Sequence, residues 1–271
     1  MKRVENMTLT AKVFIGIAIV SVTFAAILFG VWTIAIPDEL IVNWLKTSVE
    51  RPLVLEVNEL RKEGLFAVRI KEIRLILPKN SDILVLQDCT VRLNPVFLPF
   101  NTVKVSFNAG LSGGHINGSG TIKDGLADIS GNMYDIELSG INYLKKFSLK
   151  GHGTLSGDFT FYKDTGELSF KIMDFAFNDI YSHGIYLPLK YFEAINGLFV
   201  LRNSQLTAES VTLSGKGIYA RIKGKIAKGT SNIKIDIMPD DNFPDRDKLA
   251  LIKNYEVSPG VYSIEIKKWL Y

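Results

Sequence analysis

A long uncharged apolar run near the N-terminus limits the structures that this chain can adopt. From Val13 to Ile36 (VFIGIAIVSVTFAAILFGVWTIAI) there is no charged residue. At about 1.5 Å of rise per residue, a helix of this length exceeds the roughly 30 Å hydrocarbon core of a bilayer. A cleaved signal peptide would have a shorter apolar region and a small-residue cleavage site. The run therefore predicts an uncleaved transmembrane anchor over 13–36.

The charges that flank this run predict its orientation. Lys2, Arg3 and Lys12 precede it with only Glu5 against them, whereas Asp38 and Glu39 follow it. By the positive-inside rule, residues 1–12 form a cytoplasmic tail. The rest of the chain is then expected outside the cytoplasm, in the periplasm or its equivalent, with the anchor as a single pass through the membrane.

A short amphipathic helix is expected directly after the anchor, within 37–51. Asp38 is a candidate N-cap, and Leu40, Ile41, Trp44 and Leu45 recur at helical spacing before Pro52. Such a helix would either lie on the bilayer or cover one end of the domain that follows.

Beyond Pro52 the apolar period changes to two, which is typical of strands with one buried face. The clearest runs alternate apolar with polar side chains and cover 103–107, 218–226 and 233–237. Less regular runs of the same kind cover 53–57, 65–77, 83–93, 127–141, 157–162, 168–177, 198–202 and 206–213. The apolar face switches around Lys71 and Glu72, and again after Ile172, as a bulge or a change of strand would cause.

Tight Gly-rich or polar turns separate these runs, which favours an antiparallel meander over βαβ units. Glycines inside the strands favour a strongly curved sheet. One helical interruption is expected near Lys190–Asn196 (KYFEAIN). The fold class expected is therefore mainly β: a transmembrane helix, then a curved antiparallel sheet with one or two short helices. The sheet would form either an open half-barrel or groove, or a sandwich with a packed core.

The domains expected are a tail at 1–12, the anchor at 13–36, the short helix at 37–51 and a periplasmic β-rich domain at 52–239. Residues 240–271 would form a C-terminal tail that includes one last strand. Its start, MPDDNFPDRDK (238–248), mixes prolines with both signs of charge and is interpreted as a solvated linker.

Composition excludes several kinds of partner. The chain has 32 Lys and Arg against 28 Asp and Glu, and both signs are dispersed, so a nucleic-acid partner is not expected. The lone Cys89 cannot form an internal disulfide, and it lies on the same face as Ile83, Val85 and Val91, which predicts a core residue.

No group of residues has the spacing of a catalytic or metal site. His115, His152 and His183 form no recognised ligand pair. There is no G-x-S-x-G elbow, and Ser214–Gly217 lacks the remainder of a phosphate loop, so a β-turn is expected there. Asp240, Asp241, Asp245 and Asp247 fall in the interpreted linker. We expect no enzymatic activity, no catalytic, cofactor-binding or metal-binding residues, and no cofactor.

Three segments carry a resemblance to a known group of proteins: Ile36–Leu45, Leu138–Phe161 and Phe192–Ile226, the last with an L-S-G-K-G turn leading into a strand that ends in G-K-I. The layout resembles the AsmA/TamB-like envelope proteins, and within them the GspN-type accessory components of type II secretion systems. The resemblance implies a non-enzymatic inner-membrane protein that contacts other envelope or secretion proteins. The alternative that it implies is a lipid-binding or lipid-transfer module with an apolar β-groove.

Overall fold

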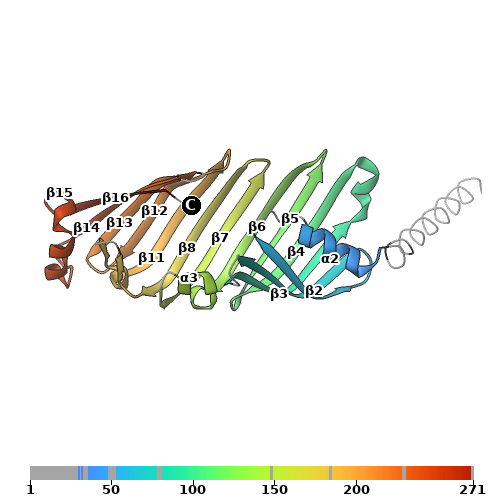
Figure 1. Ribbon diagram of the computed structural model, residues 1–271, viewed down its shortest axis with the longest axis horizontal. Coiled ribbons are helices and arrows are strands. Elements are labelled where there is room, and N and C mark those ends of the chain that lie inside the picture. Colours follow the sequence, from blue (N-terminus) through green and yellow to red (C-terminus); the bar gives the residue numbers. More distant parts are fainter. Residues whose placement is uncertain are drawn as a thin grey trace, which may run out of the picture.

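A single large antiparallel sheet dominates the computed structural model of this chain (Figure 1). The structure describes residues 30, 32, 36–47, 53–77, 81–146, 149–182, 185–227 and 230–269. The sheet has 14 strands in the order β1-β2-β3-β4-β5-β6-β7-β8-β11-β12-β13-β14-β16-β15. Nearly every strand therefore pairs with its neighbours in sequence, which confirms the mainly β, antiparallel meander expected from the tight turns.

The strands of the first half are β1 (Val54–Lys62), β2 (Ala67–Leu77), β3 (Ser81–Asn94), β4 (Thr102–Leu111), β5 (Gly114–Lys123), β6 (Leu126–Glu137), β7 (Gly151–Tyr162) and β8 (Thr165–Phe177). The second half has β11 (Phe192–Arg202), β12 (Gln205–Gly215), β13 (Ile218–Ala227), β14 (Thr230–Pro239), β15 (Glu256–Ser258) and β16 (Val261–Trp269). A separate hairpin pairs β9 (Ile180–Ser182) with β10 (Ile185–Leu187). The helices are α2 (Asp38–Thr47) and α3 (Asn142–Lys146), and the 3-10 segments are η2 (Pro95–Phe100), η3 (Leu138–Gly140), η4 (Leu189–Tyr191) and η5 (Arg246–Tyr255).

The three clearest alternating runs lie in β4, β13 and β14, as predicted. The expected helix near Lys190–Asn196 is wrong, because only the 3-10 turn η4 precedes β11. Residues from Phe192 onward form a strand between β8 and β12, where the backbone hydrogen-bonds to both neighbours. Phe192 is buried there, so pairing and burial outweigh the weak local preference for helix.

Most of the expected anchor lies outside the described residues. Within them, no helix is long and apolar enough to cross a membrane. The last part of the run is described at Gly30, Trp32 and Ile36. Trp32 is buried against the sheet, with its ring 5.6 Å from that of Phe66, and Ile36 packs on the same cluster.

The short helix expected after the anchor is α2, which begins at Asp38 itself. Its Ile41 and Leu45 pack against the buried cluster of Val68, Ile70 and Cys89. Of the two roles left open by the sequence, the helix therefore takes the second and covers one end of the sheet.

Left-handed residues inside the strands explain where the apolar face switches. Asp174 has φ 51°, the β7–β8 register shifts between His152 and Thr154, and Ile172 and Phe175 are consequently both buried. This confirms the bulge expected after Ile172. At Lys71 the β1–β2 register does not shift, and no bulge lies in β2 itself.

The irregularity near Lys71 lies in the flanking strands, where Glu59 and Asp88 have φ 51° and 47°. The left-handed conformation of Asp88 also changes the expected surroundings of Cys89. The Cys89 side chain is buried, as predicted, but Leu86 rather than Val85 packs in its cluster.

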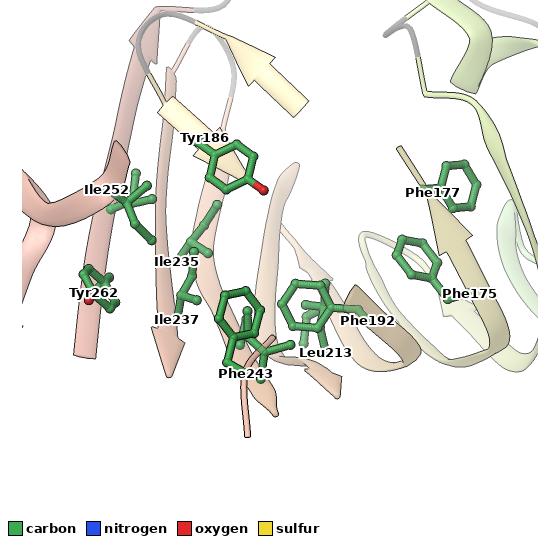
Figure 2. Close-up of a cluster of buried hydrophobic side chains, with 14 of the residues drawn as sticks. Phe175, Phe177, Tyr186, Phe192, Leu213, Ile235, Ile237, Phe243, Ile252 and Tyr262 are labelled. Atoms are coloured by element: carbon green, nitrogen blue, oxygen red, sulfur yellow. The ribbon is translucent and has the colours of Figure 1, made fainter. Parts of the chain in front are cut away.

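A second buried cluster closes the C-terminal end of the sheet (Figure 2). Ile237, Ile264 and Tyr262 from the sheet face Phe243 and Ile252 from the segment that follows β14, with Tyr186 from β10 above them. The interpretation of 238–248 as a solvated linker is thus wrong, because Phe243 is only 3% exposed. The chain after Pro239 folds back over the sheet before β16 pairs with β14.

A polar network holds this covering segment in place. Asp245 accepts a hydrogen bond from the Tyr191 hydroxyl and lies 2.8 Å from the Lys248 amine and 3.5 Å from that of Lys190. The hydrogen bonds from Lys248 and Tyr191 lower the pKa of the Asp245 carboxyl to about 2. Asp245 therefore links the covering segment to η4.

The shifted pKa of Asp245 predicts a specific dependence of stability on pH. Its contribution is complete above the ordinary carboxyl pKa of about 3.9 and is lost as the pH falls toward 2. We expect Asp245→Asn to lower the unfolding temperature at pH 7, by a difference that shrinks between about pH 4 and pH 2. Thermal unfolding of both proteins across this range measures it. Asp241→Asn, whose side chain is fully exposed, is the matched control, and a pH-independent difference for Asp245→Asn would contradict the assignment.

Candidate functional site: the apolar face of the sheet

Cross-strand register places two continuous apolar rows on one face of the sheet. Residues directly opposite each other in an antiparallel pair project from the same face. One row runs through Ala109, Ile116, Met133, Gly157, Phe170, Gly197, Val211, Ile222, Ile235 and Ile264. The next runs through Val68, Val91, Phe107, Gly118, Gly131, Phe159, Leu168, Phe199, Ala208, Gly224, Ile233 and Ile266. Neither row contains a polar side chain. A third, shorter row on the same face runs through Val105, Gly120, Ile129 and Phe161, and the three rows form the apolar face.

The opposite face of the same strands is polar. Asn108, Asn117, Asn132 and Asp158 are successive partners across β4 to β7. Beside them Ser106, Ser119, Ser130 and Thr160 form a second row of partners. A hollow of about 480 Å³ on these strands is lined by both rows together with Phe107, Gly118, Gly131 and Phe159. The two faces thus differ sharply in chemistry.

Phenylalanine rings lie over glycines on the apolar face. A Cβ added to Gly118 would lie 2.5 Å from Cζ of Phe107, and one added to Gly131 would lie 2.6 Å from Cζ of Phe159. The same arrangement joins Phe170 to Gly197. Because the glycines carry no side chain, each ring can lie flat along the sheet beside its partner strand. Phe107, Phe159 and Phe170 thus each lie over a glycine of a neighbouring strand.

Burial varies along the apolar face. At the two ends, Val68, Ile70 and Cys89, and then Val211, Ile235 and Ile264, are buried beneath α2 and the C-terminal covering segment. Between these ends, the side chains of the apolar rows on β4 to β8 are half-buried except for that of Ala109, and Phe161 is 40% exposed, although Ile136 and Ile172 on the same strands are buried. We call this stretch the open section; its residues are Phe107, Ile116, Ile129, Met133, Phe159 and Phe161.

The residues considered for chemistry lie apart from one another. His115 contacts Tyr134 in a tilted arrangement, with ring centroids 5.4 Å apart, and His152 is exposed on β7, while His183 lies outside the described residues. Burial raises the pKa of the Cys89 thiol to about 11. Ser214 and Gly215 end β12 and lead into the β-turn expected there. In the described part of the chain, no group of three His, Cys, Asp or Glu side chains could hold a metal ion.

The alternating runs of the sequence predicted an apolar face, but they did not predict which phenylalanine on this face would lie over which glycine. The pairing of Phe107 with Gly118, or of Phe159 with Gly131, requires the register between strands. A usable signal was the position of each glycine within an alternating run on the apolar side, since glycine there leaves space that a large cross-strand neighbour can fill.

Comparisons of the chain with protein-family models, with curated proteins and with solved structures found no match.

Proposed function

We propose that this protein is a non-enzymatic, membrane-anchored envelope protein whose apolar face binds the acyl chains of lipids. The observation that carries the proposal is the open section, where half-buried Phe, Ile and Met side chains form a continuous surface between two covered ends. Contiguous exposed apolar surface of this kind marks a binding site rather than ordinary solvent-facing sheet.

The dimensions and chemistry of the open section suit an extended hydrocarbon chain. Strands lie about 4.8 Å apart, so the distance from β4 to β8 is roughly 20 Å, which accommodates most of an acyl chain. Each buried methylene contributes about 0.8 kcal/mol. The rows run across the strands without a charge, so a chain lying along them meets only apolar atoms. The polar opposite face stays in water.

The expected location agrees with this ligand. The uncharged run over 13–36 and its flanking charges favour a single-pass anchor in the bacterial inner membrane, with the N-terminus in the cytoplasm and the sheet in the periplasm. A sheet tethered there would have lipid within reach. The resemblance to AsmA/TamB-like proteins also supports a lipid-binding module.

Charge placed in the open section tests the proposal. We expect the full chain, extracted in mild detergent, to carry phospholipid in native mass spectrometry, and Ile129→Glu to lose most of it, because a carboxylate on this face must be desolvated by a bound acyl chain. Ser130→Glu, the next residue on the opposite face, is the matched control. Equal lipid content in the two variants, with unchanged circular dichroism, would contradict the proposal.

A second candidate function rests on the last edge of the sheet. β15 pairs only with Val261 and Tyr262 of β16, so from Ser263 onward β16 has no partner strand on that side among the described residues. An exposed edge can add a strand from another protein. This is how an accessory component of a type II secretion system would contact its neighbours. Cross-links from β16 to secretion subunits, together with absence of lipid, would favour this candidate.

A further inference from the structure

The connection between β3 and β4 exposes an unusual set of apolar side chains. Its 3-10 segment η2 has the sequence PVFLPF, in which Val96 is 68%, Leu98 38% and Phe100 70% exposed. None of the residues in η2 is buried. Single exposed apolar residues are common, but three on one short connection form a protruding apolar tip.

The backbone of this tip is largely satisfied within the tip itself. Asn94 accepts a hydrogen bond from the Val96 amide, Asn101 donates to the Leu98 carbonyl, and the Thr102 hydroxyl donates to the Phe100 carbonyl. Pro95 and Pro99 have no amide hydrogen. Unpaired backbone groups are what makes an irregular segment costly to place in an apolar medium. The tip therefore carries little of that cost.

The tip lies where the chain would leave the bilayer. The Leu93 amide donates to the Phe66 carbonyl over 2.7 Å, which places the start of the tip beside the β1–β2 turn. Phe66 in turn contacts Trp32, and Lys62 donates to the Ile36 carbonyl at the end of the expected anchor. Figure 1 shows the β3–β4 connection, in teal beside β4, at the same end of the molecule as α2.

Neighbouring turns on the same edge of the sheet add apolar and basic groups. In an antiparallel meander alternate turns lie on one edge, so the β1–β2 and β5–β6 turns flank the tip, and the Asn101 side chain donates to Asp124 of the latter. These turns expose Leu65 and Leu126. Lys104 lies 4.0 Å from the Phe97 ring centroid, and Lys123 is exposed beside Asp124. Apolar side chains with lysines just behind them suit the boundary between acyl chains and phosphate headgroups.

We infer that η2 inserts Val96, Leu98 and Phe100 into the outer surface of the membrane that anchors the chain, and so holds the edge of the sheet against the bilayer. The inference rests on the proposed function for the choice of a lipid surface as the partner. To the proposed function it adds the segment that touches the membrane. From η2 the apolar face continues across β4 to β7 through Val105, Ile129 and Phe161.

A fluorescent label that reports bilayer depth tests the inference. Val96→Cys and Val257→Cys place a thiol at two valines of almost equal exposure, 68% and 67%, and Val257 lies in β15 at the other end of the sheet. The full chain would be labelled with the environment-sensitive dye NBD and reconstituted in vesicles of phosphatidylethanolamine and phosphatidylglycerol. Buried Cys89, with its raised pKa, should stay unlabelled, which the labelling ratio of the unsubstituted chain checks.

Interfacial apolar segments reach about 5–10 Å into the boundary, so lipids with a shallow nitroxide should quench more than about half of the emission at position 96 and leave that at 257 nearly unchanged. Equal quenching at both positions, or emission at 96 that depends on protein rather than lipid concentration, would overturn the inference, the latter in favour of a second copy. The result is independent of the lipid carried by the Ile129→Glu variant. Loss of lipid there with no quenching at 96 would leave the proposed function standing without this contact.

Discussion

Replacing Ile264 by alanine is expected to lower the free energy of unfolding by about 2–5 kcal/mol, the range for removing a large aliphatic side chain from a packed core. Ile264 is fully buried, and it pairs with Ile235 in the cluster beneath the C-terminal covering segment. The loss combines the transfer free energy of the deleted carbons with that of the cavity they leave. Urea unfolding followed by circular dichroism measures it.

The matched control for Ile264→Ala is Glu265→Ala on the next residue of β16. The Glu265 side chain is 56% exposed and forms an ion pair with Lys267, so its removal should change stability by less than about 0.5 kcal/mol. Similar losses for the two variants would show that the C-terminal cluster does not contribute as a packed core.

Replacing Gly131 by valine is expected to lower the free energy of unfolding by about 1–3 kcal/mol, although valine is the better strand former. The added Cβ would lie 2.4 Å from the Asn117 carbonyl oxygen and 2.6 Å from Cζ of Phe159. The ring can rotate away, but the carbonyl belongs to the backbone of β5, so the strands themselves must separate. The same denaturant measurement applies.

A second variant separates the two contacts of Gly131. Combining Gly131→Val with Phe159→Ala removes the ring contact and leaves the backbone contact, so the pair should couple favourably relative to the sum of the single changes. Ser130→Val, on the opposite face of the same strand, should be nearly neutral or stabilising. A neutral Gly131→Val would mean that glycine is not required beneath the Phe159 ring.

The alternating runs predicted the strands well because side-chain period is a local property. Val103 to Phe107 and Ile233 to Ile237 alternate without interruption and lie in β4 and β14. The bulge after Ile172 was also readable, since a one-residue change of phase must appear in the pattern. At Lys71 the same signal was misleading, because the left-handed residues lie in neighbouring strands, at Glu59 and Asp88.

Features that depend on contacts between distant segments could not be predicted. A helix was expected near Lys190–Asn196, whereas Phe192 begins β11, which forms by pairing with β8 and β12. Phe243 lies among prolines and aspartates that are typical of a linker, yet it is buried through packing on the C-terminal cluster. The proposed site was predicted only as an apolar face, since which part of it stays open depends on where α2 and residues 240–255 cover it.

The difference between the covered ends and the open section has a mechanical consequence. In the middle of β5 and β6, Ile116, Ile129 and Met133 are only half-buried and the two strands are joined by backbone hydrogen bonds, whereas each end of the sheet is stiffened by a close-packed cluster on its apolar side. A stretch of sheet that carries less packing can change its twist at small cost, because strand twist varies over a wide range. The middle of the sheet is therefore the compliant part, able to adjust the spacing of its side chains to chains of different length while the ends keep the strands in register.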